Sequence, residues 1–118
     1  MPFRLVVPRT GRVVAHRIVR ASTAVDRARG LLGREPLAEG EALLLEPARQ
    51  VHTFGMSYDL DVCFCDRRWR VARVVRSMPP RRLTRWVLRA HCAIEMRAGG
   101  FAGVGAGDQL SLEELSER

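Results

Sequence analysis

Short runs that are either apolar throughout or alternate between apolar and polar residues, broken by turn-forming residues, constrain the fold more than any other feature. Eight runs have this character: residues 3–7, 12–19, 42–45, 51–56, 60–66, 70–76, 90–96 and 108–112. Successive side chains of an extended chain point to opposite faces, so these runs predict strands that pack on a core. Thr10-Gly11 suits a hairpin turn between the first two runs. Pro47 and Pro79-Pro80 end the strands before them, because proline cannot donate to a sheet ladder.

One segment has a helical pattern instead. Thr23 is a suitable N-cap, Asp26 follows three residues later, and Gly33 suits the C-terminal end. An apolar stripe lies between them at helical spacing, formed by Val25, Ala28 and Leu32. Residues 81–89 are compatible with either a loop or a helical turn. The predicted class is therefore α+β and mostly β: a compact antiparallel sheet or barrel-like domain with one or two short helices.

The length and hydropathy of the chain predict a single domain. The 118 residues, of which 47% are hydrophobic, suffice for one core over about residues 3–112, followed by a charged tail at 113–118. No apolar run is long enough for a transmembrane helix, and the first apolar stretch is too short for a secretory signal. We therefore expect a cytoplasmic protein. In that compartment Cys63, Cys65 and Cys92 are expected to be free thiols.

The charge is strongly positive, with a formal net charge of +7 and 20 basic residues, all of them arginine. Two arginine clusters stand out, at residues 67–76 and at 81–89, where Trp86 lies among them. Arginine interleaved with an aromatic residue is typical of a single-stranded nucleic-acid groove. Aromatic residues make up only 6% of the chain, however. We favour a solvated surface, or one that docks onto an acidic protein or lipid headgroups, over a nucleic-acid face.

No established motif for phosphate binding or metal binding is present. The glycines between residues 99 and 107 lack phosphate-loop spacing. Cys63 and Cys65 would share one face of a strand and, with His52 and Met56, resemble a soft-metal site. Their spacing matches no zinc pattern, and cysteine acting as a small buried apolar residue explains them equally well. No metal and no cofactor are predicted.

His52, Asp61 and Arg29 are the strongest candidates for a ligand site. A carboxylate beside an imidazole fixes its tautomer and raises its pKa, as acid–base catalysis or ligand binding requires. A buried, satisfied histidine and a turn-capping aspartate are the structural alternative. Arg29 precedes Gly30 in the expected helix and suits bidentate binding of a carboxylate or phosphate. It suits a structural pair with Asp61 or Glu95 equally well.

Several of these residues also carry a family resemblance. The ordered set runs Arg29-Gly30-Leu31-Leu32, His52-Thr53-Phe54-Gly55-Met56, Leu60-Asp61 with Phe64 and Asp66, Glu95 before Ala98-Gly99, and Gly107-Asp108. It resembles the small prokaryotic family called domain of unknown function 192, over roughly residues 3–112. The resemblance implies a compact, mostly antiparallel β-fold with one or two short helices, and it implies no reaction. Leu32 and Gly55 depart from the methionine and tryptophan common in that family, so no aromatic-lined site is assumed.

Three functions are compatible with these residues. The favoured one is a small binding or accessory module, with a pocket between helix and central strands for a small anionic ligand or a peptide end. Arg29, His52 and Asp61 should then converge on one concavity, and the full set of candidate ligand-binding residues is Arg29, His52, Phe54, Met56, Asp61 and Glu95. A small enzyme using His52 and Asp61 is the alternative. Nucleic-acid binding through the arginine clusters is the weakest, and a protein partner remains open.

Overall fold

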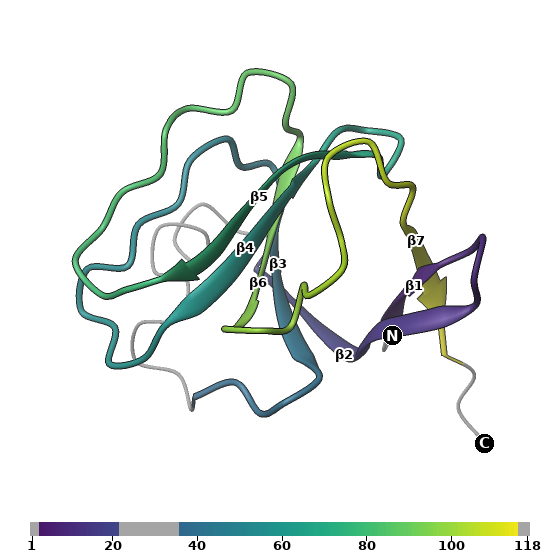
Figure 1. Cartoon of the computed structure of the whole chain (residues 1–118), viewed down its shortest axis with the longest axis horizontal. Helices are drawn as coiled ribbons and strands as arrows, with labels where there is room; N and C mark the ends of the chain where they lie inside the picture. Colours follow the sequence, from purple (N-terminus) through teal and green to yellow (C-terminus); the bar gives the residue numbers. More distant parts are fainter. Residues whose placement is uncertain (1–2, 22–35, 116–118) are drawn as a thin grey trace.

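Seven strands form a single mixed sheet in the computed structural model, which describes residues 3–21 and 36–115 (Figure 1). In chain order they are β1 (Phe3–Val7), β2 (Arg12–Ala21), β3 (Glu41–Leu45), β4 (Leu60–Cys65), β5 (Val71–Met78), β6 (Cys92–Arg97) and β7 (Ser111–Glu114). These two stretches contain no helix, and hence none long and apolar enough to cross a membrane. The strand-rich prediction is confirmed. The helix expected at residues 23–33 lies outside the described residues.

The strands lie in the order β5-β4-β6-β3-β2-β1-β7. Every neighbouring pair is antiparallel except β2 and β3, which run parallel with Arg17 opposite Glu41 and Ala21 opposite Leu45. The predicted antiparallel sheet is therefore mixed, because it contains one parallel pair among mostly antiparallel ones. A parallel pair needs a connection of a dozen or more residues, and the chain between Ala21 and Glu41 is that long. A period of two marks strands without marking their direction.

The two ends of this order approach each other through loop backbone. Leu110 N–H donates to Trp69 O at 2.9 Å, and Val71 exchanges 2.8 Å hydrogen bonds with Gly107 and Asp108. These contacts join the start of β5 to the segment that precedes β7. The sheet order itself stays open, with β5 and β7 as its edges. Curling of this kind encloses one face of the sheet more than the other.

Side chains on the two faces form two cores. The first core includes Leu5, Ile18, Leu44, Cys63, Ile94, Phe101, Val104 and Leu110, the last three from the loop before β7. The second core includes Leu43, Leu45, Val51, Val62, Phe64, Val87 and Ala93, with Val51 and Val87 supplied by loops. All six residues of β4 are buried, because both faces of this strand are covered. Loops therefore complete both cores, and the loop between β3 and β4 carries the candidates His52, Phe54 and Met56.

Two expected features of the chain differ in the structure. Residues 51–56 were predicted to be a strand, but they form a loop with one isolated bridge, between His52 and Leu83. The loop turns at Gly55, which has a φ of 83°, a conformation that favours glycine. The charged tail was expected to begin at residue 113, yet Glu113 and Glu114 belong to β7 and pair with β1. Charged side chains suit an edge strand, because its outer side faces solvent.

Candidate functional site

Asp61 is held by backbone amides. Its side chain is 1% exposed, and its carboxylate accepts hydrogen bonds from the N–H groups of Ser77 (2.9 Å), Gly99 (3.1 Å) and Phe101 (3.1 Å). Ser77 belongs to the neighbouring strand β5, whereas Gly99 and Phe101 belong to the loop after β6. Backbone donors of this kind stabilise a buried carboxylate without any ligand.

Arg76 binds the backbone carbonyls of the same loop. Its guanidinium donates to the carbonyl of Phe101 at 2.6 Å and to the carbonyl of Val104. Asp61 and Arg76 therefore satisfy donors and acceptors of a glycine-rich segment that has no ladder partner of its own. A purely structural role for Asp61, as an aspartate that caps a turn, accounts for all of these contacts.

His52 lies in the loop before β4. Its Nδ1 accepts a hydrogen bond from Phe54 N–H at 3.2 Å, and its ring lies 5.9 Å from the Phe54 ring between centroids. We expected His52 and Asp61 on paired strands, and this was wrong: His52 bridges to Leu83, whereas Asp61 lies in β4 opposite Met96 of β6. The alternation of residues 51–56 imitated a strand because Val51 and Thr53 are both buried anchors of the loop.

Phe54 and Met56 differ in their surroundings. Phe54 is 52% exposed at the tip of this loop. Met56 is half-buried and packs against the second core, and its N–H donates to Thr53 O at 3.2 Å. Phe54 is thus available for a contact with a partner, while Met56 supports the loop.

Glu95 is a buried acidic side chain with an unsatisfied oxygen. It is 2% exposed, and its Oε1 atom has no hydrogen-bond partner. Burial raises the pKa of this carboxyl from 4.5 to about 7, because desolvation penalises the charged form. It lies in β6 between Leu43 of β3 and Val62 of β4, which both belong to the second core.

Asp61 and Glu95 lie on opposite faces of the sheet. Asp61 is opposite Met96, a residue of the first core, whereas Glu95 is opposite Val62 of the second core. Neighbouring side chains along a strand alternate between faces, so the two carboxyl groups do not share a pocket. Arg29 lies outside the described residues, and its convergence with His52 and Asp61 stays a prediction.

The three cysteines gather in the first core as free thiols. Cys63 and Cys65 share a face as predicted, with their Sγ atoms 3.8 Å apart, and Cys65 is opposite Cys92. The hydrogen bond with Cys63, together with burial, raises the pKa of the Cys65 thiol, and the hydrogen bond with Cys65, together with burial, raises the pKa of the Cys92 thiol. Among the described residues no group of three or more histidine, cysteine, aspartate or glutamate side chains is placed to hold a metal ion.

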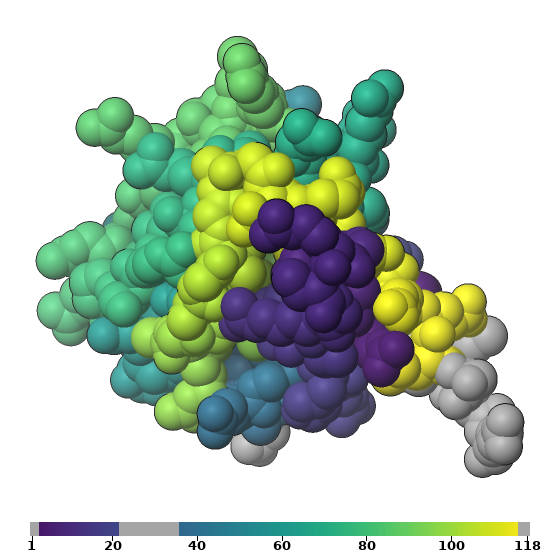
Figure 2. Space-filling view, turned by 45° about the vertical axis from the view of Figure 1, so that its right-hand side comes forward, coloured from purple at the N-terminus to yellow at the C-terminus, as the bar shows by residue number. Residues whose placement is uncertain are grey.

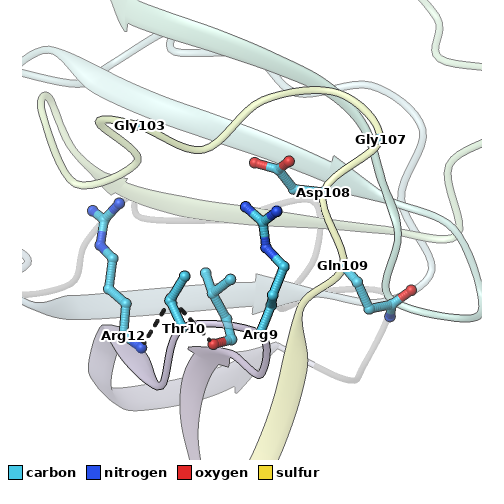
Figure 3. Close-up of a pocket in the computed structure, with 8 residues that line it drawn as sticks. Arg9, Thr10, Arg12, Gly103, Gly107, Asp108 and Gln109 are labelled. Carbon is cyan, nitrogen blue, oxygen red and sulfur yellow. Dashed lines mark hydrogen bonds between the residues drawn. The ribbon is translucent and has the colours of Figure 1, made fainter.

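A surface hollow of about 380 Å³ lies elsewhere, between the β1–β2 turn and the loop at residues 103–109. Arg9 and Arg12 both rise from the turn toward this loop, as Figure 3 shows. Neither guanidinium takes part in any of the ion pairs formed by the part of the chain that the structure describes. The hollow therefore contains two cationic groups that no described carboxylate neutralises through an ion pair.

Turn geometry places both arginines. Thr10 and Gly11 N–H groups donate to Val7 O at 3.2 and 2.9 Å, and Gly11 has a φ of 75°. The hydroxyl oxygen of Thr10 accepts a hydrogen bond from Arg12 N–H at 3.3 Å. Across the hollow, a Cβ added to Gly103 would lie 3.0 Å from Arg12 Nη1, so the guanidinium rests against that glycine.

One acidic residue also lines the hollow. Asp108 accepts a hydrogen bond from Gly105 N–H at 2.9 Å, which fixes the loop, and its carboxylate lies above Arg9 in Figure 3. Sequence reasoning noted the hairpin turn and the glycine-rich loop separately and missed that they face each other. The two arginines that flank Thr10-Gly11 were the available signal, but their partner segment lies about a hundred residues further along the chain.

Comparisons with known proteins agree with this fold. A protein of unknown function from Novosphingobium aromaticivorans superposes with a TM-score of 0.75 at 20% identity, over 94% of this chain and 84% of that one. A putative transcription regulator from Sinorhizobium meliloti gives 0.74 at 21% identity, over 93% and 91%. At these identities the likeness shows the fold alone. No curated protein sequence matches the chain. The family model DUF192, described as an uncharacterized ACR, matches residues 5–112, and the chain belongs to this family.

Proposed function

We propose that the protein is a small binding module whose ligand is an anion held in the hollow between the β1–β2 turn and residues 103–109. The observation that carries the proposal is the pair of guanidinium groups, Arg9 and Arg12, that point into one hollow without an ion-pair partner among the described residues. A phosphate or a carboxylate is the chemical group that such a pair recognises. The proposed ligand is still the small anion or peptide end expected from the sequence, but its site is this hollow instead of the one expected at Arg29, His52 and Asp61.

Guanidinium chemistry favours this ligand class. The planar group presents a rigid fork of N–H donors that matches two oxygens of a carboxylate or phosphate, and it stays charged at any physiological pH. Thr10 and Gln109 also line the hollow, but their polar groups are used within the protein. The Thr10 hydroxyl accepts from Arg12 N–H, and the Gln109 amide donates to the carbonyls of Arg68 and Leu110 and points away from the arginines in Figure 3. The two guanidinium groups therefore supply the donors for the ligand.

Asp108 limits the size and charge of the ligand. Its carboxylate lines the hollow and would repel a highly charged polyanion. The net charge of +7 still attracts anions to the molecule as a whole and speeds their encounter. A small monoanion or dianion fits these opposing effects better than a nucleic-acid strand does.

Calorimetric titration with inorganic phosphate and with acetate tests the proposal. A hydrogen bond to a charged group contributes about 1.5–3 kcal/mol, so the double substitution R9Q/R12Q should weaken binding of the preferred anion by about a hundredfold or more. R67Q/R68Q is the matched control, because it removes the same charge at two exposed arginines that do not line the hollow. Equal affinity in wild type and R9Q/R12Q would refute the proposed site.

A peptide end is distinguished from a free anion by a second titration. A short peptide with a free C-terminal carboxylate is compared with the same peptide amidated at its C-terminus. Tighter binding of the free acid that is lost in R9Q/R12Q identifies a peptide end as the ligand. Equal binding of both peptides assigns the hollow to small free anions instead.

A further inference from the structure

Large apolar side chains are exposed along the segment between β5 and β6. Leu83 is 59% exposed, Trp86 61% and Leu88 78%, and Phe54 of the neighbouring loop is 52% exposed. In Figure 2 side chains in the green of this part of the sequence project from the outline of the molecule. Exposed side chains of this size that gather in one region mark an interaction surface.

The segment is anchored, so its exposed side chains have fixed positions. Thr84 and Val87 are buried, and their N–H groups donate to Val51 O at 2.9 Å and to Arg49 O at 2.8 Å. Ala90 is buried as well, which gives an inward residue at every third position. The residues between these anchors must face outward.

Phe54 is tied to the same surface. The hydroxyl of the preceding residue, Thr53, donates to Pro79 O at 2.7 Å and accepts from Arg82 N–H at 2.9 Å. His52 bridges to Leu83 and its ring contacts the Phe54 ring. The two loops therefore form one surface, which we call the arginine–tryptophan face: Phe54 and the exposed residues of segment 81–89.

Charge on this face has a single sign. Arg81, Arg82, Arg85 and Arg89 are exposed between the apolar residues. No aspartate or glutamate occurs between Asp66 and Glu95 in the sequence. Apolar side chains flanked by arginines, without acidic residues among them, complement a surface that is anionic outside and apolar beneath.

We propose that the arginine–tryptophan face docks onto the surface of a membrane rich in anionic phospholipid. Phosphate headgroups would pair with the arginines, while Trp86, Leu83 and Leu88 would enter the boundary between headgroups and acyl chains. A groove in this face would favour a protein or nucleic-acid partner over a membrane. Neither of the two described hollows, at the β1–β2 turn and beside residues 96–100, is lined by these exposed residues.

Vesicle binding tests this inference. The protein is mixed with vesicles of pure phosphatidylcholine, or with phosphatidylglycerol added, and the bound fraction is measured by sedimentation. We expect binding only to the anionic vesicles. Each arginine near such a surface contributes about 1 kcal/mol, or about fivefold in partitioning, so R85Q/R89Q should lower the partition coefficient about 25-fold. W86S/L88S keeps the net charge of the wild type and should lower the partition coefficient more than R85Q/R89Q does.

The control is R67Q/R68Q, which removes the same charge from the turn between β4 and β5, where both arginines are exposed and lie outside the arginine–tryptophan face and the anion hollow. This variant should bind vesicles as wild type does. Acyl chains carrying bromine should quench Trp86 fluorescence in the W69F background, and circular dichroism confirms that each variant is folded. Equal loss in R85Q/R89Q and R67Q/R68Q would overturn the inference, because it would show attraction by net charge alone. An unquenched Trp86, or binding to a single-stranded oligonucleotide or an acidic peptide but not to vesicles, would overturn it as well.

Discussion

Replacing Glu95 with glutamine isolates the energetic cost of a buried acid. The side chain lies between Leu43 and Val62 in the second core, and its Oε1 atom has no partner. Burial raises the pKa of this carboxyl from 4.5 to about 7. The folded protein therefore keeps a proton on Glu95 at pH values where the unfolded chain releases it. Glutamine has nearly the same shape and no charge at any pH.

The sign and size of the effect follow from linkage. Stability contributed by the protonated carboxyl is fully present below pH 4.5 and is lost as the pH rises through about 7. A tenfold change in an ionisation constant corresponds to about 1.4 kcal/mol, so the full loss is about 3 kcal/mol. Glu95→Gln should therefore raise the free energy of unfolding at pH 8 by up to about 3 kcal/mol relative to its effect at pH 4.5.

Urea unfolding of wild type and variant at a series of pH values measures this difference. Other titrating groups contribute equally to both proteins and cancel in the comparison. Glu114→Gln is the control, because Glu114 is exposed on the edge strand β7. Its substitution should change the free energy of unfolding equally at pH 4.5 and at pH 8. A difference between wild type and Glu95→Gln that stays constant from pH 4.5 to 8 would refute the reasoning that this carboxyl is desolvated.

Three other predictions concern the sheet and its loops. Asp61→Asn should lower the free energy of unfolding, measured in thermal melts, by about 2–4 kcal/mol. One of the backbone N–H donors loses its acceptor, and the others lose a charged acceptor. A loss below about 0.5 kcal/mol would contradict the structural role of Asp61. Gly103→Ala should weaken phosphate binding, because its Cβ meets a guanidinium at 3.0 Å, whereas Gly99→Ala has a similar positive φ without that contact and should leave binding unchanged. Thiol-reactive disulfide reagents at pH 8 should leave Cys65 and Cys92 unmodified in the folded protein and modify them in guanidinium, because burial and thiol hydrogen bonds raise their pKa; rapid modification when folded would contradict this.

Most strands could be predicted from the sequence because burial in a sheet produces short apolar or alternating runs that turn-forming residues interrupt. β1 matches its predicted bounds at residues 3–7, and β3 and β4 differ by one residue at one end. The failure at residues 51–56 has a physical cause. A loop whose side chains alternately anchor in the core and face solvent has the same period as a strand, and only the hydrogen bonds distinguish them.

Candidate sites were harder to predict because they depend on contacts between distant residues. Asp61 and Glu95 were both named as candidates for one ligand site, but their registers in β4 and β6 place them on opposite faces. The hollow at Arg9 and Arg12 requires the sheet to curl until residues 103–109 reach the first hairpin. No local pattern contains that information.

Chemical-shift mapping by two-dimensional NMR with added inorganic phosphate tests the central claim, a binding hollow at the β1–β2 turn, most directly. We predict saturable shifts at the amides of Arg9, Thr10 and Arg12 and in residues 103–109, with the amides of β4 and β6 unmoved. Shifts that centre on His52 and Asp61 instead, or an unchanged spectrum at millimolar phosphate, would contradict the proposed site.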